Sequence, residues 1–540
     1  MSYLKSDKNK TILILVSMAL LGIMIQGWFI NYIDFIGVQD TYFLTASREM
    51  FSSDVLTEAE KESMKIVKDL NIDIIYPAIS GFIYFIVGDI EVAFKLCYVI
   101  FSSVLIISIF LISLRLYDRR TAVISSLLII FLPAVSITIY TAMRHVIFIS
   151  LLFLSLYFIL EASLRKRNLY YCLGGISLGF AYLTRGEGIV IFFSIFVIFI
   201  LKSYFEKKKE TREILNGSII FLVSFLFLFI PHKIFINYTS GSWGIGGDTK
   251  YQYYTFVGGQ GFVDKIKASE VVEYGLQIYG SGEENDYSIL NAIKKKPTAY
   301  LSRVIKNAKD LLTVLPTPTV LPFFLLPFIG LSLIELISNY KTMELHLIFI
   351  AIVTAFIIMI VFVFNVIPRY LTPIVPIMII WSAYGINKTQ DILRAKSFHK
   401  FAYLPSIIII LSLSIMFFAY TKTIAAALPR ETKAIGEWIK SNTSASDLVI
   451  VSKEWFDERF YLQYYSKRKV RNHSSVSEGS ILMLRQGQGR ELPAIKVNFI
   501  DSDNEKETEA VIDSYVKDLI PTELQSFKMK DHQIVIYEML

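Results

Sequence analysis

The stretch "TILILVSMALLGIMIQGWFI" (Thr11–Ile30) carries no charged side chain over its whole length. Because a transmembrane α-helix needs about 20 mainly apolar residues, this run is long enough to cross a bilayer. A basic segment precedes it and no small-residue cleavage site follows, so we expect a retained first helix and not a signal peptide. Of the 540 residues of the chain, 54% are hydrophobic and 14% are aromatic, which indicates a polytopic membrane protein.

Further apolar runs of similar length follow along the chain. They cover residues 92–114, 121–140, 145–161, 170–184, 188–202, 214–236, 320–337, 346–366, 370–386 and 403–421. Together with the first run they predict about eleven transmembrane helices. One more run, Ile74–Val87, is too short for a span and contains Tyr76-Pro77 near its start. We expect it to form a re-entrant or juxtamembrane helix.

The lysines and arginines predict the orientation of these spans. If residues 74–87 do not cross the membrane, nearly all short basic loops fall on one side. These loops are the N-terminus with Lys5, Lys8 and Lys10, residues 115–120, 165–167 and 202–212, Lys341, and residues 387–402. If residues 74–87 cross, the same loops divide between the two sides, contrary to the positive-inside bias. We therefore expect a multi-pass protein of a bacterial or archaeal plasma (inner) membrane, with a cytoplasmic N-terminus and an extracytoplasmic C-terminus.

This topology divides the chain into two predicted domains. Residues 1–421 form the transmembrane domain, with large external loops at 31–91 and 237–319. Residues 422–540 form a small extracytoplasmic domain, in which helical patterns alternate with strand patterns, so we expect α/β packing. The helical patterns cover 431–440 and 457–465, and the strand patterns cover 447–452 and 533–539. Residues 287–315 predict an amphipathic helix, which would lie on the membrane surface or against the C-terminal domain.

Several classes of function lack support in the composition. The net charge of +7 does not indicate nucleic-acid binding, because most basic residues lie in short loops between apolar runs. Cys97 and Cys172 lie in separate apolar runs and give no disulfide framework. We find no Gly-rich phosphate loop and no clustered metal-ligand spacing. No cofactor is therefore assigned, and dependence on a divalent metal stays open.

Three short turns on the predicted external side each contain one arginine, although short external turns are usually poor in basic residues. They are Arg144 in "TAMRHVIF", Arg185 in "LTRGEG" and Arg369 in "VIPRYLTP". Each alone could be a side chain snorkelling at a helix end. Together with Arg48 and His145 they predict an anion site, because guanidinium groups bind phosphate in a bidentate manner. At headgroup depth, that anion would be the phosphate of a membrane-embedded lipid.

Asp40 is the acidic residue that we expect near these arginines. It follows the first span by about ten residues and is succeeded by Tyr42 and Arg48 in a pattern typical of a short amphipathic helix. A lone aspartate in a loop is more often a turn former or a cap. A position at the membrane surface would instead make it available for acid–base chemistry.

The order of these motifs resembles a known family. The first span is followed by "QDTYFLTASREM" (39–50), "IIYPAISGFIYFIVGD" (74–89), "LTRGEG" (183–188) and "IPRYLTPIVPIMI" (367–379). This series is similar to the GT-C glycosyltransferases, in particular the dolichyl-phosphate-mannose protein mannosyltransferase-like group and its aminoarabinose-transferase relatives. The similarity extends over nearly all of residues 1–421, whereas the C-terminal domain matches only in general character.

The resemblance implies an inverting glycosyltransferase that moves a hexosyl or pentosyl group from a polyprenyl-phosphate donor to an acceptor outside the membrane. Asp40 would be the catalytic carboxylate. The donor phosphate would meet Arg185, Arg369, Arg144 and Arg48, and the supporting residues would be Tyr42, His145, Tyr76, Glu187 and Tyr370. The chain departs from the family at Tyr76-Pro77-Ala78, where relatives often have Lys-Pro-Pro, and at Arg144-His145, where many have an acidic residue. A second catalytic or metal-binding acid is therefore not supported.

The residues agree with this chemistry on physical grounds. A lipid phosphate leaves as a stable anion whose charge arginines can stabilise. The attacking acceptor needs a base, which contributes about 10²–10⁴ in rate when well placed. Two other classes stay open: a membrane polymerase or ligase of lipid-linked glycans, and a lipid or solute transporter. The sequence does not identify the sugar or the acceptor, which could be a protein, a lipid or a glycan.

Overall fold

The computed structural model describes two compact units. The described residues are 2–33, 38–51, 75–135, 143–205, 208–240, 293–294, 297–338, 340–363, 366–396 and 398–427, parts of 433–467, and six strands between 448 and 539. The first unit comprises Met1–Gly37 and Asp69–Ala426, and the second comprises Val38–Lys68 and Ala427–Leu540.

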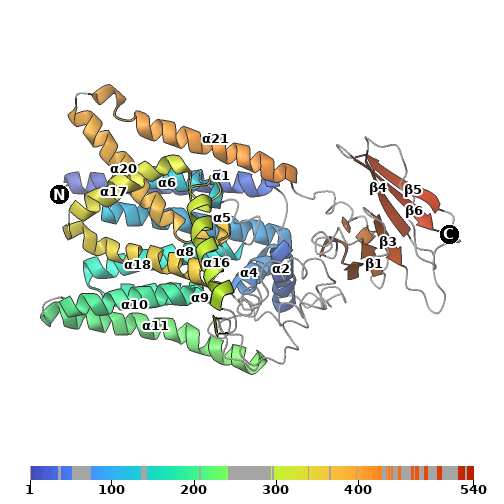
Figure 1. Ribbon diagram of the computed structural model, residues 1–540, viewed down its shortest axis with the longest axis horizontal. Coiled ribbons are helices and arrows are strands. Elements are labelled where there is room, and N and C mark those ends of the chain that lie inside the picture. The colour runs from blue at the N-terminus through green and yellow to red at the C-terminus, as the bar shows by residue number, and fades with distance from the viewer. Residues whose placement is uncertain are drawn as a thin grey trace. The chain divides into compact units, whose positions relative to one another are not determined.

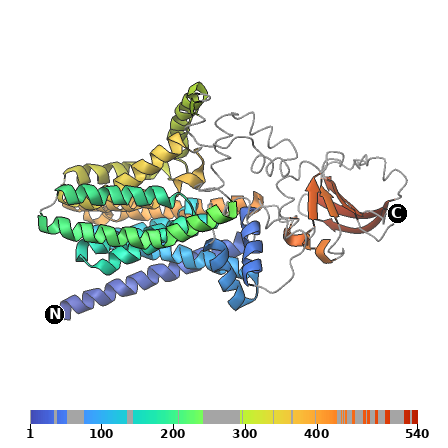
Figure 2. The same cartoon turned by 90° about the horizontal axis from the view of Figure 1, so that it is seen from below.

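The first unit is a bundle of apolar helices. Its longer helices run side by side in Figure 1 and again in Figure 2. The helices are α1 (Ser2–Ile33), α4 (Ile75–Val87), α5 (Ile90–Leu116), α6 (Arg119–Ile130), α8 (Arg144–Arg165), α9 (Asn168–Thr184), α10 (Gly188–Phe205), α11 (Lys208–Ser240), α16 (Pro297–Val314), α17 (Leu326–Ser338), α18 (Tyr340–Phe362), α19 (Pro368–Leu371), α20 (Val375–Ala395) and α21 (Leu404–Ala427).

Every predicted span coincides with a helix of this bundle. Four differ in extent. The run 121–140 is helical over α6, with residues 136–142 outside the described part, and the run 370–386 becomes α20 only from Val375, after the short α19. The run 320–337 becomes α17 only from Leu326, and the run 346–366 corresponds to α18, which begins earlier and ends at Phe362. Among the described residues, five helices are long and apolar enough to cross a membrane, namely Lys8–Ile33, Ile90–Leu116, Arg144–Arg165, Thr211–Tyr238 and His399–Ala425. The chain is therefore a multi-pass membrane protein, while the number of eleven spans and the behaviour of α4 stay predictions.

Glycine and aspartate residues at the helix junctions determine where one helix ends and the next begins. Gly88 ends α4 with a positive φ of 77°, a conformation that glycine adopts without a steric penalty. Asp89 then caps α5 by accepting hydrogen bonds from the backbone N–H groups of Glu91 (2.8 Å) and Val92 (3.0 Å). Asp118 caps α6 in the same way through Thr121 N–H (2.7 Å). These caps satisfy backbone donors at the point where the chain turns back into the bundle.

Small residues allow the closest contacts between helices. A Cβ on Gly175 of α9 would lie 2.5 Å from the Phe221 carbonyl oxygen of α11, and one on Gly179 would lie 2.8 Å from the Leu228 side chain. The spacing of four residues places both glycines on one face of α9. Close backbone approach of this kind is a principal source of helix association in lipid.

Several charged side chains within the bundle lie near helix ends and form ion pairs. The buried Glu161 of α8 binds both Arg115 of α5 and Arg165. Lys388 of α20 pairs with Glu335 of α17 at 2.7 Å. Such pairing reduces the large cost of placing charge in a medium of low dielectric constant.

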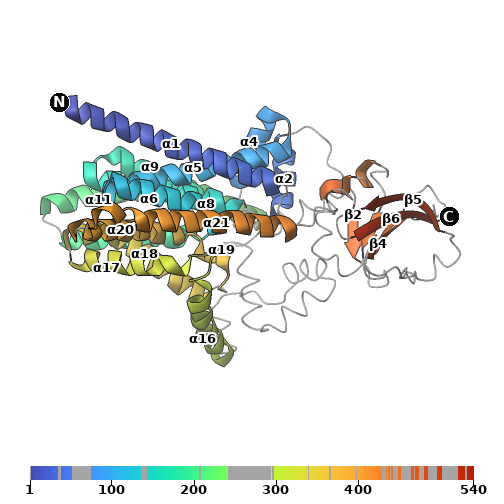
Figure 3. The same cartoon turned by 90° about the horizontal axis from the view of Figure 1, so that it is seen from above.

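Helix α16 runs crosswise to the bundle, as Figure 3 shows. It contacts α18 through hydrogen bonds from Asn307 Nδ2 to the Val361 carbonyl oxygen (3.0 Å) and from the Tyr300 hydroxyl to the Phe362 carbonyl oxygen (3.1 Å). Leu301 and Leu312 are 59% and 76% exposed. The predicted amphipathic helix therefore exists, and its exposed leucines are consistent with a membrane-surface position.

The second unit contains α2 (Val38–Phe51) and a six-stranded sheet of order β2-β1-β3-β4-β6-β5. The strands are β1 (Leu448–Val451), β2 (Lys469–Asn472), β3 (Ser480–Leu484), β4 (Ile495–Asp501), β5 (Pro521–Lys528) and β6 (His532–Met539). Strands β1 and β2 are parallel, and every other pair is antiparallel. A parallel pair needs a crossover connection, and residues 464–466 between β1 and β2 are helical. Both strands predicted at 447–452 and 533–539 are present, whereas the α/β class and the boundary at 421/422 stay predictions.

We predict opposite effects for two glycine-to-alanine substitutions. In Gly385→Ala the new Cβ would overlap the Phe328 carbonyl oxygen and force α20 away from α17, whereas nothing lies within 4 Å of a Cβ at Gly330. Gly385→Ala should therefore lower the free energy of unfolding by about 1–3 kcal/mol, and Gly330→Ala should leave it unchanged or raise it by up to about 1 kcal/mol. Thermal unfolding of the detergent-solubilised protein measures both, and equal stability of the two variants would contradict this account of the α17–α20 contact.

Candidate functional site

The turn between α9 and α10 positions Arg185 and Glu187. Arg185 is the C-terminal cap of α9, and its N–H donates to the Ala181 carbonyl oxygen at 2.9 Å. The N–H of Gly188 donates to the Arg185 carbonyl oxygen at 3.1 Å and begins α10. A Cβ on Gly188 would lie 2.7 Å from Cα of Tyr182, so only glycine permits so tight a reversal. The arginine and the glutamate are thus held at the junction of two packed helices.

Arg185 connects Glu187 to the first turn of α8. Its Nε lies 3.1 Å from Glu187 Oε2 and its Nη2 binds Glu187 Oε1, which makes a bidentate pair. Its Nη1 lies 2.8 Å from Nδ1 of the buried His145 ring. Because a guanidinium can only donate, the ring nitrogen that faces it must accept. The Arg185 and Glu187 side chains are only 5% and 13% exposed, so solvent screens this pair weakly.

Arg369 and Tyr370 reach the same place from α19, almost two hundred residues later in the sequence. The guanidinium carbon of Arg185 lies 5.7 Å from the centre of the Tyr370 ring, and that of Arg369 lies 5.3 Å from it. The ring thus contacts two cations, an arrangement stabilised by the negative face of the π-system. Among the described residues, the buried Nε–H of Arg369 finds no hydrogen-bond acceptor. A buried donor without an acceptor can donate a hydrogen bond to an oxygen atom of a ligand.

Arg144 begins α8 beside His145 and contributes a third guanidinium. It acts electrostatically on both His145 and Glu187, and Arg369 also acts on His145. Burial by itself raises the pKa of the Glu187 carboxyl, but the charge and hydrogen bonds of Arg185, assisted by Arg144, outweigh burial and hold this pKa below its ordinary value. Glu187 is therefore ionised at neutral pH. All three arginines act on His145, and two of them, Arg185 and Arg144, also act on Glu187, so positive charge gathers at this end of α8 and would attract an anion.

Comparison with known proteins shows which families and folds this chain resembles. The family model described as "Dolichyl-phosphate-mannose-protein mannosyltransferase" matches residues 74–235, which include Arg144, His145, Arg185 and Glu187. The search of curated proteins gives no significant match. ArnT from Cupriavidus metallidurans, solved with undecaprenyl phosphate bound, is similar over 97% of this chain and 97% of its own, with a TM-score of 0.56 and 12% identity. Residues 74–235 thus resemble the mannosyltransferase family, and the chain as a whole shares the fold of ArnT.

Archaeal oligosaccharyltransferases are also similar in fold to this chain. The Archaeoglobus fulgidus enzyme, solved with Zn and sulfate, matches 85% of this chain with a TM-score of 0.53 and 15% identity. The archaeal AglB from the same organism, solved with an inhibitory peptide and a dolichol-phosphate, has a TM-score of 0.52 and 14% identity. This chain spans only 62% and 65% of those two proteins. At such identities the likeness shows the fold alone.

The remaining predicted residues of the GT-C site divide into two groups. Tyr76 is fully buried in the first turn of α4, which packs against α5 and α9. Asp40, Tyr42 and Arg48 lie on α2 in the second unit, and the side chains of Asp40 and Tyr42 fall outside the described residues. Their roles therefore stay predictions. Within the described part of the chain, no three His, Cys, Asp or Glu side chains gather as metal ligands would.

Two residues near this end of the GT-C bundle were missed by the sequence analysis. His232 Nδ1 lies 3.4 Å from the hydroxyl of Tyr182, one turn before Arg185, and the adjacent Lys233 is 7% exposed. Both follow Pro231 inside α11. The signal was present in the sequence, because a basic pair within an apolar run is rare and its members face protein more often than lipid.

We predict that Glu187→Gln lowers stability in a pH-dependent manner. Because the folded pKa of Glu187 is depressed, its pair with Arg185 contributes fully above the ordinary carboxyl pKa of 4.5 and is lost as the pH falls below that value. At pH 7 the variant should lose about 1.5–3 kcal/mol, as expected for hydrogen bonds between charged groups, and the difference should shrink on acidification. Thermal unfolding at several pH values measures this effect. Glu335→Gln, which breaks the exposed pair with Lys388, is the control and should cost at most about 1 kcal/mol.

Proposed function

We propose that the chain is an inverting glycosyltransferase that transfers a sugar from a polyprenyl-phosphate donor to an acceptor on the extracytoplasmic side of the membrane. The observation that carries this proposal is the gathering of Arg144, Arg185 and Arg369 around His145, with Arg185 and Arg369 both at the ring of Tyr370. These residues come from three separate segments and lie where helices α8, α9 and α19 begin or end. Helix ends of this kind lie at the depth of lipid headgroups.

The three arginines have different tasks in this proposal. Arg185 pairs with Glu187 and contacts His145, so its guanidinium is held in a fixed position within the site. Arg369, whose buried Nε–H has no acceptor among the described residues, would bind the donor phosphate together with Arg144. Because the phosphate gains negative charge as the sugar leaves, cations placed beforehand stabilise the transition state more than the ground state. A general acid for the leaving group is then unnecessary.

The named ligands of the relatives support a lipid phosphate as the donor group. ArnT is described with undecaprenyl phosphate, and AglB is described with a dolichol-phosphate. Both ligands join a phosphate to a long isoprenoid chain, and such a molecule can present its phosphate to a site at the rim of a helix bundle. A glycosyl group linked to that phosphate is the natural donor for this chain.

Asp40 is the proposed catalytic base. It lies in the first turn of α2, soon after α1 leaves the bundle, and it matches the family's aspartate in the first external loop. A carboxylate there would remove the proton from an acceptor hydroxyl or amine as it attacks opposite the departing phosphate. Attack from the opposite face inverts the anomeric carbon. The sugar and the acceptor stay unassigned.

A second candidate is the transfer of a larger lipid-linked glycan, which the likeness to the archaeal oligosaccharyltransferases favours. The match to ArnT, which covers 97% of each chain, favours the first candidate. A transporter is less well supported, because the charged residues described inside the bundle, such as Glu161 with Arg115 and Arg165, form pairs near helix ends.

We predict that Arg369→Ala raises the Michaelis constant for the lipid-linked donor by about 10–100-fold, which corresponds to the loss of hydrogen bonds between charged groups. The measurement is transfer of radiolabel from a polyprenyl-phosphate sugar to an acceptor, with purified protein in lipid nanodiscs. Arg394→Ala is the matched control, because it removes the same charge from the last turn of α20, where Arg394 pairs with Asp391. Unchanged kinetics of Arg369→Ala would exclude it from the donor site. Movement of label across the bilayer without transfer would favour a transporter.

We predict that Asp40→Asn lowers the turnover number by at least about 10²-fold while donor binding persists, since an amide keeps the shape of the side chain but cannot take a proton. Glu49→Gln, in the last turn of the same helix α2, should retain normal turnover. The same radiolabel assay applies, together with a direct donor-binding measurement. Full activity of Asp40→Asn would overturn its assignment as the base.

A further inference from the structure

The C-terminal end of α18 is completed by side chains of another helix. The last four carbonyl groups of a helix have no partner within that helix. In α18 the first of these, the Met359 carbonyl oxygen, accepts a hydrogen bond from the Val363 N–H at 2.8 Å, just beyond the helix. The carbonyl oxygens of Ile360, Val361 and Phe362 accept hydrogen bonds from α16, the helix that runs crosswise to the bundle. All four carbonyl groups are therefore satisfied.

Asn307 and Tyr300 are the two donors on α16. Asn307 Nδ2 lies 3.0 Å from the Val361 oxygen and 3.4 Å from the Ile360 oxygen. An amide nitrogen carries two hydrogen atoms, so it can serve both carbonyl groups. The Tyr300 hydroxyl lies 3.1 Å from the Phe362 oxygen. The two donors are seven positions apart, which places them on one face of α16.

These hydrogen bonds determine where α18 ends. Asn307 is only 3% exposed, and a carbonyl group removed from water is costly when it lacks a donor. Helix α18 cannot satisfy its carbonyl groups by continuing into α19, because α19 begins at Pro368 and the residue before a proline disfavours a helical conformation. Ile367 is extended accordingly, with φ −124° and ψ 141°. The chain must leave the helix before Ile367, and the contact with α16 allows it to leave after Phe362.

The end of α18 is close in sequence to the predicted donor site. Arg369 follows Phe362 by seven residues and is the second residue of α19. On the other side of Arg369, the Thr372 hydroxyl donates to the Arg369 carbonyl oxygen at 2.7 Å. The segment that carries this arginine is thus held at the end of α18 and again where the chain passes into α20.

We propose that Asn307 is a positioning residue of the donor site: together with Tyr300 it holds the end of α18, and it thereby places the Arg369 guanidinium beside the ring of Tyr370. The inference rests on the proposed function, in which Arg369 binds the donor phosphate. In this role neither residue of α16 needs to contact the donor. A guanidinium binds phosphate through a planar fork, so a displacement of about 1 Å is enough to weaken the contact.

Hydrogen exchange of the full-length protein in detergent tests the anchoring of α18 without any donor. Asn307→Leu keeps the approximate size of the side chain but removes its donors. In this variant the amides of residues 359–372 should exchange at least about threefold faster than in the wild type, while those of α9 stay unchanged. Ser302→Leu makes a comparable change at an exposed position of α16 and should alter neither. Unchanged exchange in Asn307→Leu, or faster exchange throughout the bundle, overturns the inference.

Donor kinetics test the connection to Arg369. Asn307→Leu should raise the Michaelis constant for the polyprenyl-phosphate sugar about three- to tenfold, as expected for the loss of buried hydrogen bonds. Tyr300→Phe removes only a hydroxyl and should raise it about twofold. Because the effect passes through Arg369, Asn307→Leu should add less than about twofold in the Arg369→Ala background. An equal effect of Asn307→Leu in both backgrounds would show that Asn307 acts by another route.

The two measurements separate failure of this inference from failure of the proposed function. If the wild type transfers no sugar, the proposed function fails and the donor-site role of Asn307 fails with it, while hydrogen exchange still decides whether α16 anchors α18. If the wild type is active and Arg369→Ala raises the Michaelis constant but Asn307→Leu does not, the proposed function stands and the positioning role of Asn307 is wrong.

Discussion

The high cost of charge in a medium of low dielectric constant governs this structure. Apolar helices satisfy their own backbone groups, so charged residues collect at helix ends, where they pair or meet the headgroup region. The Arg185–Glu187 pair is the central instance. The glutamate makes it possible to bury a guanidinium at the α9–α10 junction, and that guanidinium in turn orients His145 and contacts the ring of Tyr370. The rest of the arginine site is built upon this pair.

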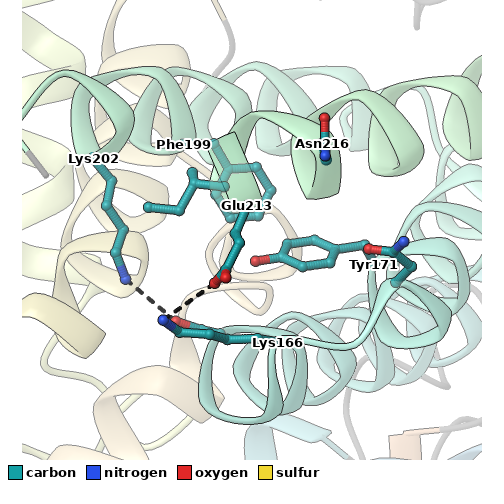
Figure 4. A pocket seen from close by; sticks show the side chains of 9 residues that line it. Lys166, Tyr171, Phe199, Lys202, Glu213 and Asn216 are labelled. Carbon is teal, nitrogen blue, oxygen red and sulfur yellow. Dashed lines mark hydrogen bonds and ion pairs between the residues drawn. The ribbon is translucent and has the colours of Figure 1, made fainter. Parts of the chain in front are cut away.

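The same constraint gives the helices two chemically different ends. One end of α8 and α9 carries three guanidinium groups around His145, beside Glu187. At the other end Lys166 pairs with Glu213, as Figure 4 shows. A guanidinium has a planar fork that can hold two oxygen atoms in fixed positions, whereas an ammonium is a flexible point charge.

The likeness to ArnT and to the archaeal oligosaccharyltransferases concerns the fold, and the chemistry must come from the site. At 12–15% identity, most side chains differ while the order and packing of helices persist. Packing tolerates this divergence because helices associate through small residues and shape, as Gly175 and Gly179 do in the contact of α9 with α11. The arginine positions lie where helices end, and these ends are the positions that a conserved bundle fixes best.

The sequence alone determined the class of protein, the location of the helices and the identity of the arginine turns. An apolar run of about 20 residues forms a helix in lipid. Arginines in short turns on the predicted external side can be recognised from the sequence, because the positive-inside rule predicts few basic residues there. Only the tertiary structure decided that Arg144, Arg185 and Arg369 gather around His145 and that Tyr370 contacts two of them. Residues as distant as Arg185 and Tyr370 are brought together by helix packing, and packing depends on side-chain shapes along whole faces, which local sequence patterns do not encode.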